Sequence, residues 1–111
     1  MKFEVTKNGK ATVLKLRGRK LDATVCPELK AEFLVLCKPK VTQLLIVDMA
    51  EVQFCDSSGL SALLIADRTM REHGGRVNLV HVNKKVIDLM KISQLDRVFT
   101  ISDKVADALA G

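Results

Sequence analysis

The spacing of hydrophobic and polar positions changes along the chain, and each change predicts a new element of secondary structure. Residues 3–18, FEVTKNGKATVLKLRG, place apolar side chains on both sides of Asn8-Gly9. Asn and Gly tolerate positive φ, so this pair predicts the turn of a β-hairpin. Residues 41–49, VTQLLIVDM, are apolar without alternation, which is typical of a central strand covered on both faces.

Helical spacing follows the hairpin. Residues 27–38 begin with a proline, which suits the first turn of a helix, and Pro39 after them is a stop signal. The apolar residues of this segment recur at helical spacing: Leu29, Phe33 and Leu36. A second helix is predicted from Gly59 to about His73, where Gly74-Gly75 ends it.

The last part of the chain alternates between strand and helix signals. Residues 76–82, RVNLVHV, predict a strand, and Asn83 is placed to cap a short helix through Met90. Residues 97–101, RVFTI, predict a last short strand, and Ser102-Asp103 then caps a final helix. We expect two residues on the inner side of that helix: Val105 and Leu109.

This order of elements predicts an α/β fold, in which an N-terminal hairpin and the βα units after it form a mixed β-sheet with helices packed on it. The chain has 111 residues, 48% of them hydrophobic, and shows no linker, repeat or low-complexity tract. We therefore expect residues 1–111 to form a single domain. No apolar run reaches the length of a membrane helix and the N-terminus lacks a signal-peptide core, so we expect a cytoplasmic protein without membrane contact.

Charge and cysteine content narrow the choice of function. The net charge is +5, but the basic residues are spread out and do not alternate with aromatics, which favours a solvated surface over a nucleic-acid interface. An acidic protein partner is compatible with this charge. Cys26, Cys37 and Cys55 lack CxxC spacing and are interpreted as small buried hydrophobes. His73 and His81 complete no ligand set with them, so we expect neither a metal nor another cofactor.

The segment FCDSSGLSALLIADR, residues 54–68, contains the candidate chemistry. Asp56 and Ser57 stand where a helix begins, and the side-chain oxygen of either could accept from its first amides. Gly59 is interpreted as the residue that lets the chain turn tightly. Two interpretations remain open: the serine is part of a helix cap, or it is displayed for modification.

The helix after these serines has a clear core face. On a helical wheel this face carries four residues: Ala62, Leu63, Ala66 and Met70. Leu60 and Leu64 fall instead near Asp67 and Arg71. They either line a rim that a second protein could use, or are covered by a neighbouring helix, and the sequence leaves both open.

A phosphate on the first serine would bring nearly two negative charges to the positive end of the helix. Backbone amides there are ready donors to anions, so the fold should tolerate the group. The effect would fall on whatever docks there, because an interface built for a neutral hydroxyl would meet bulk and charge.

The chain resembles a STAS domain of the bacterial anti-sigma-factor antagonist type over essentially its whole length. The strongest match is VDMAEVQFCDSSGLSALL, residues 47–64, in which a hydrophobic strand and an acidic connection precede Asp-Ser-Ser/Thr-Gly-Leu at the start of a helix. Further matches are LRGRKLDA at 16–23, REHGGRVNLV at 71–80 and VIDLMKISQLDRVFTI at 86–101.

The resemblance implies a binding protein that is not an enzyme. Such domains capture an anti-sigma factor, a serine protein kinase, when unphosphorylated, and so release a sigma factor for transcription. The kinase would phosphorylate Ser57, directly after the aspartate, and a metal-dependent serine phosphatase would reset it. The loop with Leu21-Asp22 lies near the phosphorylated turn in the family. The partner-binding residues implied are Asp22, Asp56, Ser58, Gly59, Leu60 and Leu64.

Arg19-Lys20 departs from the family pattern, which usually has one residue fewer before Leu-Asp and often an acidic one. The departure adds positive charge near the expected partner face and leaves the partner's identity open. An alternative is a STAS domain that scaffolds a complex or senses a small ligand or nucleotide, with Ser57 only a cap. An enzyme is not expected, because Ser57 lacks a G-x-S-x-G elbow and no triad or carboxylate pair is recognisable.

Overall fold

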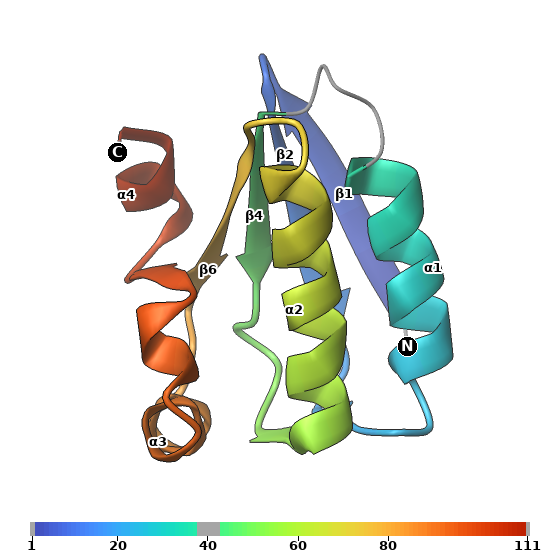
Figure 1. Ribbon diagram of the computed structural model, residues 1–111, viewed down its shortest axis with the longest axis vertical. Helices are drawn as coiled ribbons and strands as arrows, with labels where there is room; N and C mark the ends of the chain where they lie inside the picture. The colour runs from blue at the N-terminus through green and yellow to red at the C-terminus, as the bar shows by residue number, and fades with distance from the viewer. Residues whose placement is uncertain (1, 38–42, 111) are drawn as a thin grey trace.

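The computed structural model describes residues 2–37 and 43–110 (Figure 1). Its strands form two β-sheets. The larger sheet contains β1 (Lys2–Asn8), β2 (Ala11–Arg17), β4 (Leu44–Asp48), β6 (Arg76–Val80) and β7 (Thr100–Ser102). The smaller sheet pairs β3 (Lys20–Leu21) with β5 (Phe54–Cys55). The helices are α1 (Cys26–Cys37), α2 (Ser57–Arg71), α3 (Lys84–Ile92) and α4 (Val105–Ala110), with a 3-10 turn, η1 (Leu95–Arg97).

The larger sheet has the strand order β1-β2-β4-β6-β7 and is mixed, as the sequence predicts. β1 and β2 form the predicted antiparallel hairpin, in which Asn8 pairs with Ala11 and Gly9 adopts a φ of 62°. The neighbouring pairs β2-β4, β4-β6 and β6-β7 are parallel. The carboxyl ends of four strands therefore share one edge, opposite the hairpin turn, and α2 begins at this end of the molecule (Figure 1).

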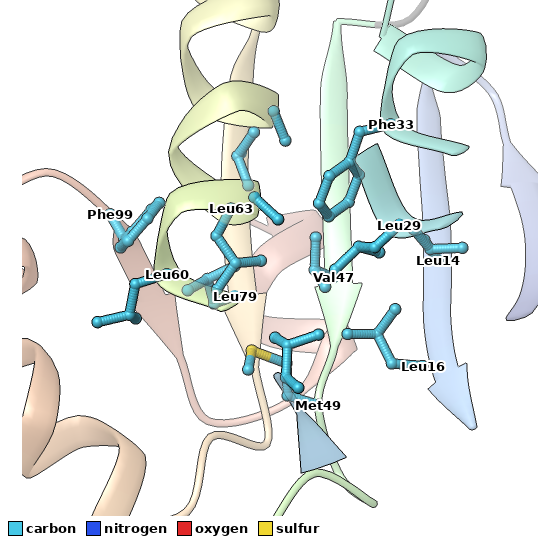
Figure 2. Packing of buried hydrophobic residues seen from close by; sticks show 14 of the residues in the cluster. Leu14, Leu16, Leu29, Phe33, Val47, Met49, Leu60, Leu63, Leu79 and Phe99 are labelled. Carbon is cyan, nitrogen blue, oxygen red and sulfur yellow. The ribbon is translucent and has the colours of Figure 1, made fainter. Parts of the chain in front are cut away.

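The main core lies between one face of the sheet and helices α1 and α2, which run side by side across it (Figure 1). Leu14, Val47 and Leu79 are register neighbours on β2, β4 and β6, and all are fully buried. Phe33 of α1 and Leu63 of α2 belong to the same cluster (Figure 2). The predicted core face of α2 is confirmed, since each of its members is buried: Ala62, Leu63, Ala66 and Met70.

The opposite face of the sheet carries a smaller cluster under α4. Ile46, Val80 and Ala108 are fully buried there, and Val105 packs against them. The prediction that Leu109 faces inward is wrong, because its side chain is 38% exposed. Ala108 occupies the centre of the inner side, and one residue further the helix has already turned Leu109 toward solvent. Both faces of β4 are covered, as predicted.

Boundaries differ from the sequence predictions where signals are short. The strand predicted over 97–101 is β7, which begins only at Thr100, because Arg97 ends η1 and residues 98–99 form the turn after it. Ser102 belongs to that strand, and α4 begins at Val105. The predicted central strand is confirmed as β4 from Leu44, while Pro39 and residues 41–42 lie outside the described part of the chain.

One predicted helix start is confirmed by a hydrogen bond, and one predicted helix end by a glycine with positive φ. The Asn83 side chain accepts from the backbone N–H of Val86 at 2.9 Å and caps α3. α2 ends at Arg71, and Gly74 follows with a φ of 81°. No helix within the described ranges is both long enough and apolar enough to span a membrane.

Candidate functional site

The smaller sheet joins two segments that are distant in sequence. Lys20 pairs with Phe54 and Leu21 with Cys55 in parallel register. The backbone N–H of Asp56 then donates to the Leu21 carbonyl at 3.2 Å. The loop after β3, which leads into α1, therefore lies directly beside the turn that opens α2.

Asp56 is the cap of α2. Its backbone is extended, and Oδ1 accepts from the N–H of Gly59 at 3.0 Å. Its backbone carbonyl accepts from the N–H of Leu60 at 3.1 Å. Of the two cap candidates in the sequence, Asp56 thus accepts from the Gly59 N–H, which has no partner within the helix. The cap does not use the Ser57 side chain.

Gly59 has a different role from the predicted one. Its φ is not positive, so the turn does not require glycine for backbone freedom. A Cβ at this position would lie 2.4 Å from the Leu21 carbonyl oxygen and 2.8 Å from Sγ of Cys55. Glycine is needed because the first turn of α2 rests against the backbone of β3.

The two serines differ in exposure. Ser57, the first residue of α2, is exposed, and Ser58 is half-buried. Ser57 is therefore accessible to a visiting protein. It stands at the positive end of a 15-residue helix, where the electrostatic environment favours an added anion.

A second acid stands in the loop before α1. Oδ1 of Asp22 accepts from the backbone N–H of Thr24 at 3.0 Å and from its hydroxyl at 2.5 Å. The hydroxyl bond is the main reason that the pKa of Asp22 lies below its ordinary value. Burial raises the pKa of the Cys26 thiol, and the charges of Asp56 and Asp22 raise it further. Both carboxylates therefore act on the same thiol, beside the turn that presents Ser57.

Leu60 and Leu64, for which the sequence leaves open a rim or a covered position, differ in their surroundings. Leu60 is only 4% exposed and belongs to the main cluster with Phe99, so it is covered and does not form a rim. Figure 2 shows the Leu60 side chain near that of Phe99. Leu64 is half-buried and lines a hollow of about 420 Å³ with Asp67, Arg68, Arg71, Glu72 and Val98.

Phe54 was missed by the sequence prediction. Its ring is 51% exposed, although Cys55 beside it is buried. The signal is weak in the sequence, because alternation over a two-residue strand cannot be recognised. Arg19 and Lys20, which the sequence singles out for their charge, lie at the same place, since Lys20 is the register partner of Phe54.

A second feature also escaped the sequence prediction. Asp48 ends β4 and is 8% exposed, and its Oδ1 lies 2.9 Å from Nδ1 of His81. The same oxygen accepts from the N–H of Ala50 at 3.0 Å. His81 follows β6 with a φ of 56°. Asp48 ends β4 and His81 directly follows β6, the adjacent parallel strand, and that topology was the signal that could have placed them together.

All three cysteines are free and buried, in agreement with their interpretation as small hydrophobes. Burial raises the pKa of Cys37 to about 11 and, as the largest of several causes, the pKa of Cys55 to about 12. Across residues 2–37 and 43–110, no group of three or more His, Cys, Asp and Glu side chains is placed to hold a metal ion.

Fold and site together define a small α/β domain with a mixed sheet, which presents an exposed serine at the mouth of a central helix. The family model described as the STAS domain matches residues 2–108. The chain belongs to the STAS domain family.

Solved structures share this fold. An anti-sigma-factor antagonist (STAS) domain protein from Planctomyces limnophilus superposes with a TM-score of 0.88 at 20% identity, covering 97% of this chain and 94% of that one. An anti-sigma factor antagonist from Mycobacterium paratuberculosis gives 0.82 at 21% identity, with 98% and 91% covered. Bacillus SpoIIAA in its phosphorylated form gives 0.74 at 19% identity, with 98% and 97% covered. At these identities the similarity establishes the common fold.

Proposed function

We propose that this protein is an anti-sigma-factor antagonist whose binding is switched by phosphorylation of Ser57. Unphosphorylated, it binds an anti-sigma factor that is a serine protein kinase and thereby frees a sigma factor for transcription. Phosphorylated, it is released. The observation that carries the proposal is the exposed Ser57 hydroxyl at the first position of α2, beside a cap that Asp56 completes without it.

The geometry of the site supports a switch in which a phosphate acts on binding and leaves the fold unchanged. The helix end attracts the anion, and the cap hydrogen bond from Gly59 to Asp56 does not involve Ser57. Asp22 and Asp56 already bring negative charge to the turn around Ser57, and a phosphate would add nearly two more negative charges there. A partner fitted to the neutral hydroxyl would then meet repulsion and bulk at the contact.

The other site residues support this role in different ways. Asp56 and Gly59 shape the turn, and Asp22 shapes the adjoining loop. Ser58 is partly enclosed and is the weaker acceptor, while Leu64 contributes an apolar contact at the helix surface. We further propose a metal-dependent phosphatase that resets Ser57, action in the cytoplasm, and no catalytic activity, membrane contact or direct binding of nucleic acid by the chain itself.

The direct test is incubation with purified anti-sigma kinases of the source organism and ATP, followed by mass spectrometry. We expect one phosphate on Ser57, none in Ser57→Ala, and an unchanged yield in Ser58→Ala. Phosphate on another residue, or none from a kinase active on a control substrate, would refute the assignment.

A second measurement separates switching from folding. Ser57→Asp should keep the circular dichroism spectrum of the wild type and lose affinity for the kinase by about tenfold or more, because charge enters the contact. Ser61→Asp, exposed on the same helix one turn on, is the matched control and should bind as the wild type does. A collapsed spectrum for Ser57→Asp would contradict the separation of switch and scaffold.

A further inference from the structure

The outer face of the smaller sheet is an apolar surface with a basic border, which we call the Phe54 surface. It consists of Arg19, Lys20, Val25, Phe54, Lys85 and Leu89. In both strands the inward residue is buried, Leu21 in β3 and Cys55 in β5, so Lys20 and Phe54 face outward as register partners.

The Phe54 ring stands between two hollows. The first, about 560 Å³, lies on the side of Val25 and is lined by Gly18, Arg19, Lys20 and Gln53 as well as Phe54. The second, about 250 Å³, lies on the side of α3 and is lined by Gln53, Phe54, Cys55, Lys85, Val86 and Leu89. An apolar side chain from outside could therefore contact the ring on either side. Half-exposed aromatic rings beside hollows are frequent anchors of protein contacts.

The border of this surface is cationic. Arg19 donates from Nη2 and Nε to Oε1 of Gln53, at 2.9 and 3.3 Å, so its side chain is held in place by a neutral amide. The amide orients the guanidinium without neutralising it. Lys20 and Lys85 are exposed on the two sides of Phe54.

We propose that the Phe54 surface binds an acidic protein segment of the partner that bears at least one apolar side chain. The apolar side chain packs against Phe54 in a flanking hollow, and carboxylates pair with Arg19, Lys20 and Lys85. This inference rests on the proposed function and adds the chemistry of the partner. Phe54 precedes Ser57 by only three positions, so a partner held here has its surface next to the hydroxyl.

The charge pattern favours an acidic protein over other anions. A lipid headgroup or a nucleic-acid backbone would need only cations, and an exposed, hollow-flanked ring contributes little to either contact unless bases stack on it. A protein segment uses the cations and the hollows together.

A random-peptide phage library provides a probe that requires no kinase. Selection on immobilised wild-type protein, with depletion on Phe54→Asp, should enrich peptides that contain Asp or Glu beside a large apolar residue. Enrichment without an acidic bias, or no enrichment above the Phe54→Asp background, would overturn the proposal.

A selected peptide then allows matched comparisons by fluorescence anisotropy. Phe54→Ala and the double variant Arg19→Glu/Lys20→Glu should each weaken binding by about tenfold or more, and added salt should weaken binding to the wild type. Val35→Ala, at a side chain 68% exposed on α1, and Lys7→Glu/Lys10→Glu, at the hairpin end of the sheet, should bind as the wild type does. Equal losses in these controls would contradict a local site.

Two further arms separate this inference from the proposed function. Ser57→Ala should bind the peptide with unchanged affinity. Failure to detect phosphorylation of Ser57 would therefore not contradict binding at the Phe54 surface. Failure to select a peptide would not contradict the phosphorylation switch. Phosphatidylserine vesicles and single-stranded DNA should bind more weakly than the peptide. Tighter binding of either one, lost in Phe54→Ala, would assign the surface to a different class of partner. Circular dichroism of each variant establishes that it is folded.

Discussion

Gly59 lies where the first turn of α2 packs against β3 and β5. The family motif places glycine after the serines, and the sequence alone suggests a tight turn. The structure gives another reason: the first turn of α2 lies against the Leu21 carbonyl and Cys55, with no room for a methyl group. The distance between two backbones, and not a special φ, determines the residue type at this position.

Gly59→Ala should therefore destabilise the protein, although alanine favours helices. The added Cβ would force β3 or β5 to shift, at a net cost of about 1–3 kcal/mol in the free energy of unfolding. Ser58→Ala, one residue earlier in the same turn, should change that energy by less than about 0.5 kcal/mol. Urea denaturation followed by circular dichroism measures both. A Gly59→Ala variant as stable as the wild type would show that the contact is not tight.

Among the elements, β6 contains one buried polar residue between buried apolar ones. Asn78 is 4% exposed and lies between Ile46 of β4 and Thr100 of β7 in the sheet register. Its Oδ1 is buried and accepts no hydrogen bond from the described residues. A buried polar atom without a partner loses its hydration and gains no hydrogen bond in return. Asn78 therefore stabilises the fold less than an apolar side chain at the same position would.

Asn78→Val should raise the free energy of unfolding by about 1 kcal/mol, since it removes the orphan acceptor and suits a strand. Asn78→Asp is the matched comparison, because it keeps the size and buries a charge, and it should lower the same energy by more than about 2 kcal/mol. The order Val, Asn, Asp in urea midpoints is the expected result. A valine variant less stable than the wild type would indicate that Asn78 has a stabilising partner.

At the scale of the whole molecule, the sequence predicts what local signals specify. The hairpin, α2 and the Asn83 cap have strong turn and cap residues, and they are where predicted. β3 and β5 have two residues each, too short for any period, and they were missed. The same limit applies to the site: Asp56 and Ser57 follow from a local cap, whereas the exposure of Phe54 depends on a strand pair that forms only in the folded chain.

The cysteines make the stability of the whole molecule sensitive to alkali. Their pKa is raised in the fold, to about 11 for Cys37 and about 12 for Cys55, from an ordinary value of 9.0. Above that ordinary value the unfolded chain releases thiol protons that the folded chain retains. The free energy of unfolding is therefore unaffected by these groups below about pH 8, and it falls as the pH rises toward the folded-state values.

Urea midpoints measured between about pH 8 and about pH 10.5 should show this fall, to which each buried thiol contributes at most about 1.4 kcal/mol per pH unit. Cys37→Ala removes one such group and should have a shallower dependence over the same range. Parallel curves for the variant and the wild type would mean that the thiol is not the source.

Under the proposed function, the pairing of β3 with β5 also determines when Ser57 becomes a substrate. Arg19 and Gln53, which bond across this junction, are 34 positions apart in the chain. A nascent polypeptide on the ribosome, or one unfolded by heat, contains the sequence of the motif but lacks the folded surface around it. A kinase that recognises the assembled surface would phosphorylate only folded molecules. The amount of phosphorylated protein would then report how much folded protein the cell holds.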